Sequence, residues 1–113
     1  MIEAAAAATT FVQDVDEATF AASDLIQSAV LQKLLVIGEA AGRVSSGIRA
    51  RWPDVPWRSV TGFRNIAVHT YFDVDWSIVW RIATTALREL QEQLTTLLKT
   101  EFPLVASQLD QPH

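Results

Sequence analysis

The stretch SDLIQSAVLQKLLVIGEAAGRV, residues 23–44, decides the fold. Ser23 or Asp24 suits the start of a helix, because a short polar side chain there accepts a hydrogen bond from a backbone N–H group that has no partner within the helix. Beyond this cap the apolar residues advance in steps of three and four, which is the period of an α-helix. Most of the circumference is apolar, so this helix is predicted to lie at the centre of the fold.

Three more helices are predicted around the central one. The alanine-rich start of the chain favours a helix over residues 2–14. Pro56 suits the first position of the helix that follows the central one. Asp73 or Asp75 can cap a last, long helix over residues 76–99. This helix carries a continuous apolar stripe, which consists of Ile78, Val79, Ile82, Ala86, Leu90, Leu94 and Leu97.

No segment alternates between apolar and polar residues as a strand does. The chain has 113 residues and half of them are apolar, which is enough for one modest core. We therefore expect an all-α fold, an up-down bundle of four to five helices. Residues 1–102 are predicted to form a single domain, and residues 103–113 a short, flexible tail.

The composition excludes several kinds of site. There are no cysteines, so disulfides, thiolate metal sites and cysteine nucleophiles are excluded.

The sequence shows neither a signal peptide nor a membrane span. The alanine run at the start lacks the basic region and the cleavage pattern of a signal peptide. Charged residues interrupt each apolar stretch within about a dozen residues, short of the roughly 20 that span a bilayer. We expect a cytoplasmic protein with no membrane partner.

Charge is distributed unevenly along the chain. The net charge is −4, yet residues 43–64 contain five arginines and a single acidic residue. Such a basic island can neutralise several phosphates, and phosphate contacts supply most of the affinity for nucleic acid. We predict that Arg43, Arg49, Arg51 and Arg58 make contacts of this kind. The alternative is that these arginines only keep the surface soluble.

The stretch RNIAVHTY, residues 64–71, concentrates four polar side chains in a segment that otherwise has the pattern of a buried helix. Each of them would cost free energy if it were buried without a partner. On a helix, Asn65 and His69 share one face, and Arg64 and Tyr71 share another. A second copy of the same helix across a two-fold axis would complete the site, so we expect a homodimer with these helices at its interface.

These residue types suit the cleavage of RNA. An imidazole titrates near neutral pH and can act as a general acid or base. A guanidinium can bind two phosphate oxygens as negative charge develops on them. Because RNA carries its own nucleophile, the 2′-hydroxyl, His69 and Arg64 could cleave it without a metal. We expect no metal site, since the other histidine is His113 in the tail and no carboxylate stands at ligand spacing from His69.

Each residue also has a structural explanation. Arg64 can pair with Glu39 of the central helix, Asn65 can hold a backbone carbonyl, and Tyr71 can lie at the edge of the core. A lone histidine near the end of a helix is more often structural than catalytic. Spaced as one set beside the basic island, the four residues together favour a functional site.

The pattern R-x4-H-x-Y from Arg64 to Tyr71 resembles the HEPN superfamily and, within it, the HepT-like toxins of prokaryotic toxin–antitoxin pairs. Further blocks carry the same resemblance. VIGEAA at residues 36–41 resembles the family's second helix, PDVPWR at residues 53–58 its connection before the motif, and YFDVD at residues 71–75 the passage into its last long helix. The resemblance covers most of the chain, and the blocks in this order are more specific than the motif alone.

This resemblance implies a homodimer whose paired motifs line a cleft and cleave RNA with no metal or cofactor. His69 would act as general acid or base, Arg64 would clamp the phosphate, and Asn65 would orient the reacting groups. We further hypothesise that Glu39 holds Arg64 in place. The resemblance also implies a partner, a minimal nucleotidyltransferase antitoxin that transfers AMP from ATP to Tyr71, where the added bulk and negative charge would exclude RNA.

Two other functions are open. The protein could be a non-catalytic helical dimer that binds RNA or a nucleotide-bearing partner, or it could be the neutralising scaffold of a nucleotidyltransferase that is itself the toxic component. Replacing His69 separates cleavage from binding, because the arginines would still carry the affinity for RNA.

Overall fold

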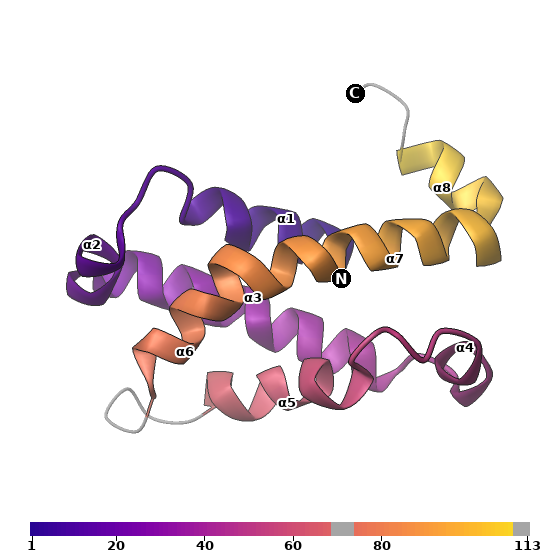
Figure 1. Cartoon of the computed structure of the whole chain (residues 1–113), viewed down its shortest axis with the longest axis horizontal. Helices are drawn as coiled ribbons and strands as arrows, with labels where there is room; N and C mark the ends of the chain where they lie inside the picture. Colours follow the sequence, from indigo (N-terminus) through magenta and orange to yellow (C-terminus); the bar gives the residue numbers. More distant parts are fainter. Residues whose placement is uncertain (69–73, 110–113) are drawn as a thin grey trace.

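The computed structural model describes residues 1–68 and 74–109, and in this part of the chain every regular element is helical (Figure 1). The elements are α1 (Ile2–Phe11), α2 (Glu17–Ala22), α3 (Asp24–Gly42), α4 (Ser46–Arg51), α5 (Trp57–Val68), α6 (Trp76–Arg81), the π-helical turn η1 (Ile82–Ala86), α7 (Leu87–Glu101) and α8 (Pro103–Leu109). The predicted all-α fold is confirmed. The predicted homodimer stays a prediction.

Helix α3 lies at the centre, between α1 and α5, as Figure 1 shows. The long helices α1, α3, α5 and α6–α7 run in alternating directions, as in an up-down bundle. By length and composition alone α3 could cross a membrane, although the sequence predicts no stretch of that length. Its side chains Val30, Leu34 and Ile37 are fully buried by the neighbouring helices, so α3 is a core helix in this fold.

Short polar residues cap the helices. The Ser23 hydroxyl oxygen accepts a hydrogen bond from the backbone N–H of Ile26 at 3.1 Å. Asp75 Oδ1 accepts hydrogen bonds from the backbone N–H groups of Ser77 and Ile78 at 3.1 and 3.4 Å. Each cap is one of the two candidates that the sequence offers for its helix, and each has extended backbone, as a capping residue should.

The first helix is shorter than predicted. It ends at Phe11, and Asp14 has a positive φ of 61°, a left-handed conformation that aspartate tolerates better than most residues. Asp16 then caps the short helix α2 by accepting a hydrogen bond from the N–H of Thr19 at 2.7 Å. The sequence predicts neither α2 nor α4, because helices of six residues carry too few positions to show a period.

The residues after 102 also contain structure. The sequence predicts a flexible tail there, but residues 103–109 form α8, and Ala106 of this helix is 5% exposed. The division of the chain into a domain that ends at residue 102 and a flexible tail stays a prediction.

The last long helix contains an irregularity that the sequence did not reveal. Its buried residues Val79, Ala83 and Leu87 are spaced by four, and each step of four rotates about 40° beyond a full α-helical turn. The wider turn of η1 takes up this drift. Leu87 is therefore buried, while Ala86 of the predicted apolar stripe is exposed. Ile78 of the stripe is exposed as well, so the prediction was wrong at these two positions.

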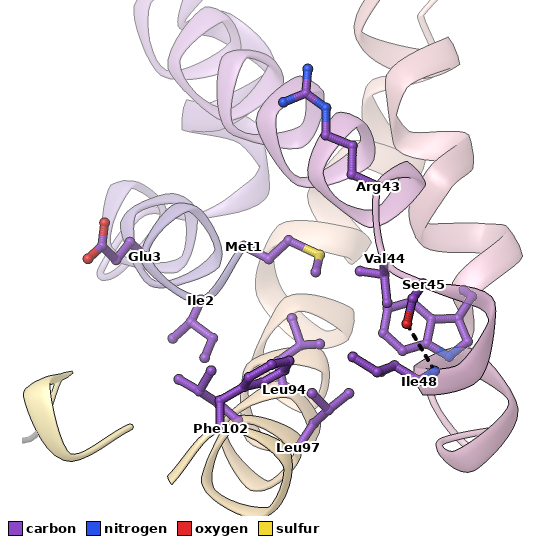
Figure 2. Close-up of a pocket in the computed structure, with 12 residues that line it drawn as sticks. Met1, Ile2, Glu3, Arg43, Val44, Ser45, Ile48, Leu94, Leu97 and Phe102 are labelled. Atoms are coloured by element: carbon purple, nitrogen blue, oxygen red, sulfur yellow. Dashed lines mark hydrogen bonds between the residues drawn. The ribbon is translucent and has the colours of Figure 1, made fainter. Parts of the chain in front are cut away.

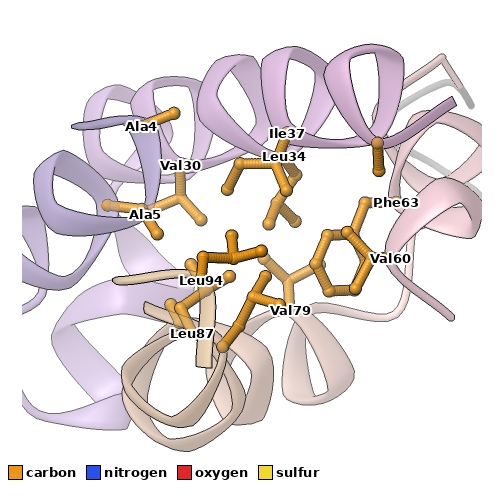
Figure 3. Packing of buried hydrophobic residues seen from close by; sticks show 14 of the residues in the cluster. Ala4, Ala5, Val30, Leu34, Ile37, Val60, Phe63, Val79, Leu87 and Leu94 are labelled. Atoms are coloured by element: carbon orange, nitrogen blue, oxygen red, sulfur yellow. The ribbon is translucent and has the colours of Figure 1, made fainter. Parts of the chain in front are cut away.

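The core forms where four helical segments meet. Figure 3 shows side chains from α1, α3, α5 and α6–α7 directed into one common interior. The residues labelled there are Ala4, Ala5, Val30, Leu34, Ile37, Val60, Phe63, Val79, Leu87 and Leu94. The alanines of α1 are small, which allows this helix to pack against both α3 and α7.

Gly38 sets how closely α5 approaches α3. A Cβ atom at this position would lie 2.6 Å from the backbone nitrogen of Arg64 and 3.2 Å from its Cβ. The first distance is an overlap with main chain, which cannot rotate away as a side chain can. Only glycine fits without moving one helix relative to the other.

Gly38→Ala is expected to lower the free energy of unfolding by up to about 2 kcal/mol, since overpacking costs about 1–3 kcal/mol and alanine recovers about 1 kcal/mol of helix propensity. Urea unfolding followed by circular dichroism measures this. Gly42→Ala is the matched control, because nothing lies within 4 Å of a Cβ there, and it should leave stability unchanged or raise it. Equal stability of the two variants would contradict the packing described here.

Candidate functional site

Arg64 lies on α5 at the position where the backbone of this helix is in close contact with Gly38 of α3. Its Nε lies 3.8 Å from Oε1 of Glu39 on α3. The side chains of Arg64 and Glu39 are 63% and 49% exposed, so the guanidinium is near its partner and still accessible from solvent. The contact expected from the sequence is therefore present, while its importance for function stays a prediction.

A groove of about 430 Å³ lies between α3 and α5 at this point. It is lined by Gly38, Glu39, Gly42, Arg43, Thr61 and Arg64. Gly42 leaves open space on the α3 side, since nothing lies within 4 Å of a Cβ there. Two arginines and one glutamate are among the lining residues, and their formal charges sum to +1. Guanidinium groups bind phosphate oxygens through paired hydrogen bonds, so the groove suits a phosphate.

The structure brings Arg64 and Asn65 together on α5, where both side chains are exposed. Helix α5 is described as far as Val68. The predicted general acid or base, His69, and the predicted modification site, Tyr71, lie outside the described residues.

The chain after residue 73 begins with a well-anchored helix. Ser77 Oγ donates a hydrogen bond to Asp75 Oδ1 at 2.6 Å, and this bond is the main reason why the pKa of Asp75 lies below its ordinary value. The ring of Trp76 packs edge-on against the buried ring of Phe20, with centroids 6.0 Å apart. Helix α2 therefore fixes where α6 begins.

Two arginines of the basic island bind other parts of the protein. Arg49 donates hydrogen bonds to the carbonyl oxygens of Ala41 and Val44, the second at 3.2 Å, and its guanidinium carbon lies 5.8 Å from the ring centre of Trp57. A cation is favoured at the carboxyl end of a helix such as α3. Arg51 donates from Nε to Glu101 Oε1 at 2.7 Å.

Arg43 and Arg58 are exposed. Arg43 shares the groove with Arg64, so of the four arginines predicted to contact RNA it is the one that the fold places beside the motif. RNA binding by any of the four stays a prediction.

The described residues contain no group of three histidine, aspartate or glutamate side chains that could hold a metal ion. A second, larger cavity of about 590 Å³ opens between the start of α1, the end of α3 and the end of α7. Figure 2 shows that its walls are mainly apolar, and that the Arg43 guanidinium is directed away from them. A mainly apolar lining does not suit a phosphate, so this cavity is a poor candidate for the site of RNA cleavage.

The model of the ribonuclease HepT-like family matches residues 1–97. The chain belongs to this family. "Putative RNase MJ1380" of Methanocaldococcus jannaschii is 31% identical over 94 residues, which cover 83% of this chain and 86% of that protein. "Probable ribonuclease HepT" of Thermococcus cleftensis is 30% identical over 73 residues, which cover 65% of this chain and 66% of the relative. No solved structure matches the chain significantly.

Membership of the HepT-like family confirms the resemblance seen in the motif and its flanking blocks. The groove itself could not be found from the sequence. Gly38, Gly42 and Thr61 belong to two different helices, and a pattern along one helix does not say which residues of another lie opposite. One local signal existed, since Gly38 and Gly42 are four residues apart and so share a face of α3.

The different roles of the arginines can be tested by stability. Arg49→Ala is expected to lower the free energy of unfolding by about 1–3 kcal/mol, because it removes charge-assisted hydrogen bonds to the end of α3. Arg58→Ala, the control on an exposed position, should change it by no more than about 0.5 kcal/mol. Thermal and urea unfolding measure both variants. If the Arg49 variant were as stable as the control, the structural role given to Arg49 would be wrong.

Proposed function

We propose that this HepT-like protein is a metal-independent endoribonuclease and acts in the cytoplasm as the toxin of a type VII-like toxin–antitoxin pair. The observation that carries the proposal is the exposed Arg64 in a cationic groove, in a chain that belongs to the ribonuclease HepT-like family. Its substrate is RNA, and its functional form is a homodimer in which two motifs face one cleft.

The proposed reaction is an internal transfer of the phosphodiester. The 2′-oxygen attacks the neighbouring phosphorus while His69 takes the hydroxyl proton. The bond from phosphorus to the 5′-oxygen breaks, and His69 then acts as acid and gives this proton to the 5′-oxygen. The products are a 2′,3′-cyclic phosphate and a free 5′-hydroxyl. Atoms and charge balance without a further reactant.

Arg64 stabilises the charge that develops on the phosphate during this transfer. Glu39 supports it as a positioning residue, since its carboxylate lies 3.8 Å from Arg64 Nε and limits the orientations that a long side chain would otherwise sample. Asn65, the next residue on α5, orients the reacting groups.

Control of the activity is proposed to act on Tyr71. A cognate nucleotidyltransferase antitoxin would bring ATP, the phenol oxygen would lose its proton to solvent and attack the α-phosphorus, and pyrophosphate would leave. The attached AMP is bulky and anionic, so it repels and blocks RNA at a site built to bind phosphate.

RNA cleavage by the purified protein in excess chelator tests the enzyme directly. The wild type should produce fragments ending in 2′,3′-cyclic phosphate, and His69→Ala should be at least about 100-fold slower, as expected for the loss of a general acid or base. Circular dichroism and light scattering control for folding and for dimer formation. Intact RNA after incubation with a folded, unmodified wild-type dimer would reject the enzyme and favour the non-catalytic RNA-binding dimer.

Tyr71→Phe tests the proposed control. The variant should cleave RNA as the wild type does, but co-expression with the antitoxin should neither add AMP to it nor silence it, because the accepting oxygen is absent. Intact-protein mass spectrometry and the same cleavage assay measure these two effects. An added AMP on the variant, or its silencing by the antitoxin, would show that Tyr71 is not the acceptor. Toxicity of the nucleotidyltransferase expressed alone would instead support the scaffold alternative.

A further inference from the structure

We infer that Arg43 is a second phosphate-binding residue, which acts with Arg64 across the groove to hold an RNA phosphate next to the one that is cleaved. The inference rests on the proposed function for the identity of the polyanion. The inference goes beyond the proposed function because Arg43 lies on α3, outside the motif. It also gives Arg43 a role that the other arginines of the basic island do not share.

The first support is the position of Arg43. It is the residue at the carboxyl end of α3, directly after Gly42, and it borders the groove together with Arg64 of α5. Because the two helices are in close contact at Gly38, both residues border the same groove although they are 21 positions apart in the chain. Two guanidinium groups on one hollow can bind oxygens of neighbouring phosphates.

The second support is that the Arg43 guanidinium is uncommitted within the described residues. Arg49 and Arg51 are engaged with backbone carbonyls and with Glu101. Glu39 lies one helical turn before Arg43, but its ion pair is with Arg64. The negative charge of Glu39 compensates the positive charge of Arg64. The positive charge of Arg43 therefore has no such compensation within the groove.

The third support is the shape and hydrogen bonding of the groove. Nothing lies within 4 Å of a Cβ at Gly42, and about 430 Å³ is many times the roughly 30 Å³ that one water occupies. The Thr61 hydroxyl donates to the carbonyl of Arg58 at 3.0 Å, so the hydrogen-bond donors available to a ligand here come mainly from the arginines. A group rich in acceptors, such as a phosphate, fits this arrangement.

Arg43 should therefore contribute to binding rather than to turnover. Fluorescence anisotropy with a 2′-O-methyl RNA oligonucleotide measures binding alone, since this probe lacks the nucleophile for cleavage. Arg43→Gln should weaken binding about five- to tenfold at roughly 0.1 M salt and reduce the salt dependence by about one phosphate contact.

Arg88→Gln is the matched control. It removes the same charge from an exposed position on α7, beside a different pocket. It should weaken binding less than about twofold if direct contact with RNA matters more than the net charge of the protein.

Gly42→Leu is a second test that changes no charge. The leucine would occupy the open space in the groove and should weaken binding as much as Arg43→Gln does. Equal binding by the Arg43 and Arg88 variants would overturn the inference, and so would unchanged binding by a folded Gly42→Leu.

Cleavage kinetics separate this inference from the proposed function. With cleavable RNA, Arg43→Gln should raise KM about five- to tenfold with kcat nearly unchanged. A wild type that binds RNA but does not cleave it would reject the proposed function, and the anisotropy comparison would still decide on Arg43. A wild type that cleaves while Arg43→Gln matches Arg88→Gln would reject the role of Arg43 and leave the ribonuclease intact.

Discussion

The contact on which the site depends is the one between Gly38 and the backbone of Arg64. A hypothetical Cβ at Gly38 would stand 2.6 Å from the Arg64 nitrogen, so α3 and α5 approach more closely here than any other residue would allow. This approach brings Glu39 within 3.8 Å of the Arg64 side chain. It also places Arg43 on the same groove. The polar residues of the site therefore meet because of a position that has no side chain.

The rest of the fold holds α3 at both ends and α5 at its start. At one end, Trp57 Nε1 donates to the carbonyl of Trp52 at 3.0 Å, and Arg49 ties the connection to the end of α3. At the other, the buried Gln27 of α3 donates from Nε2 to the carbonyl of Ala21 at 3.2 Å. Helix α2 is thereby fixed, and its Phe20 packs in turn against the aromatic residues of α6. Helix α3, which forms one side of the groove, is therefore anchored at both ends.

Periodicity along the sequence was sufficient to predict the long helices, and side-chain chemistry was sufficient to predict two of their caps. Both properties are local. The contacts that create the groove are not, and neither the role of Gly38 nor the engagement of Arg49 with α3 could be predicted from spacing. The π-helical turn η1 is a further example. The spacing of four residues between Val79, Ala83 and Leu87 indicates a wider turn only once all three are known to be buried in the same core. The contact between Glu39 and Arg64 could be anticipated because the two side chains carry opposite charges.

The most direct test is the rate of RNA cleavage at saturating RNA, in excess chelator, by the wild type and by Gly38→Ala, at a temperature where circular dichroism shows both to be folded. If the close contact of α3 and α5 positions Arg64 for the reaction, the wild type cleaves and the variant is at least about tenfold slower, because small displacements of a catalytic group reduce rates strongly. Equal rates for the two proteins, or no cleavage by the wild type, would contradict the account.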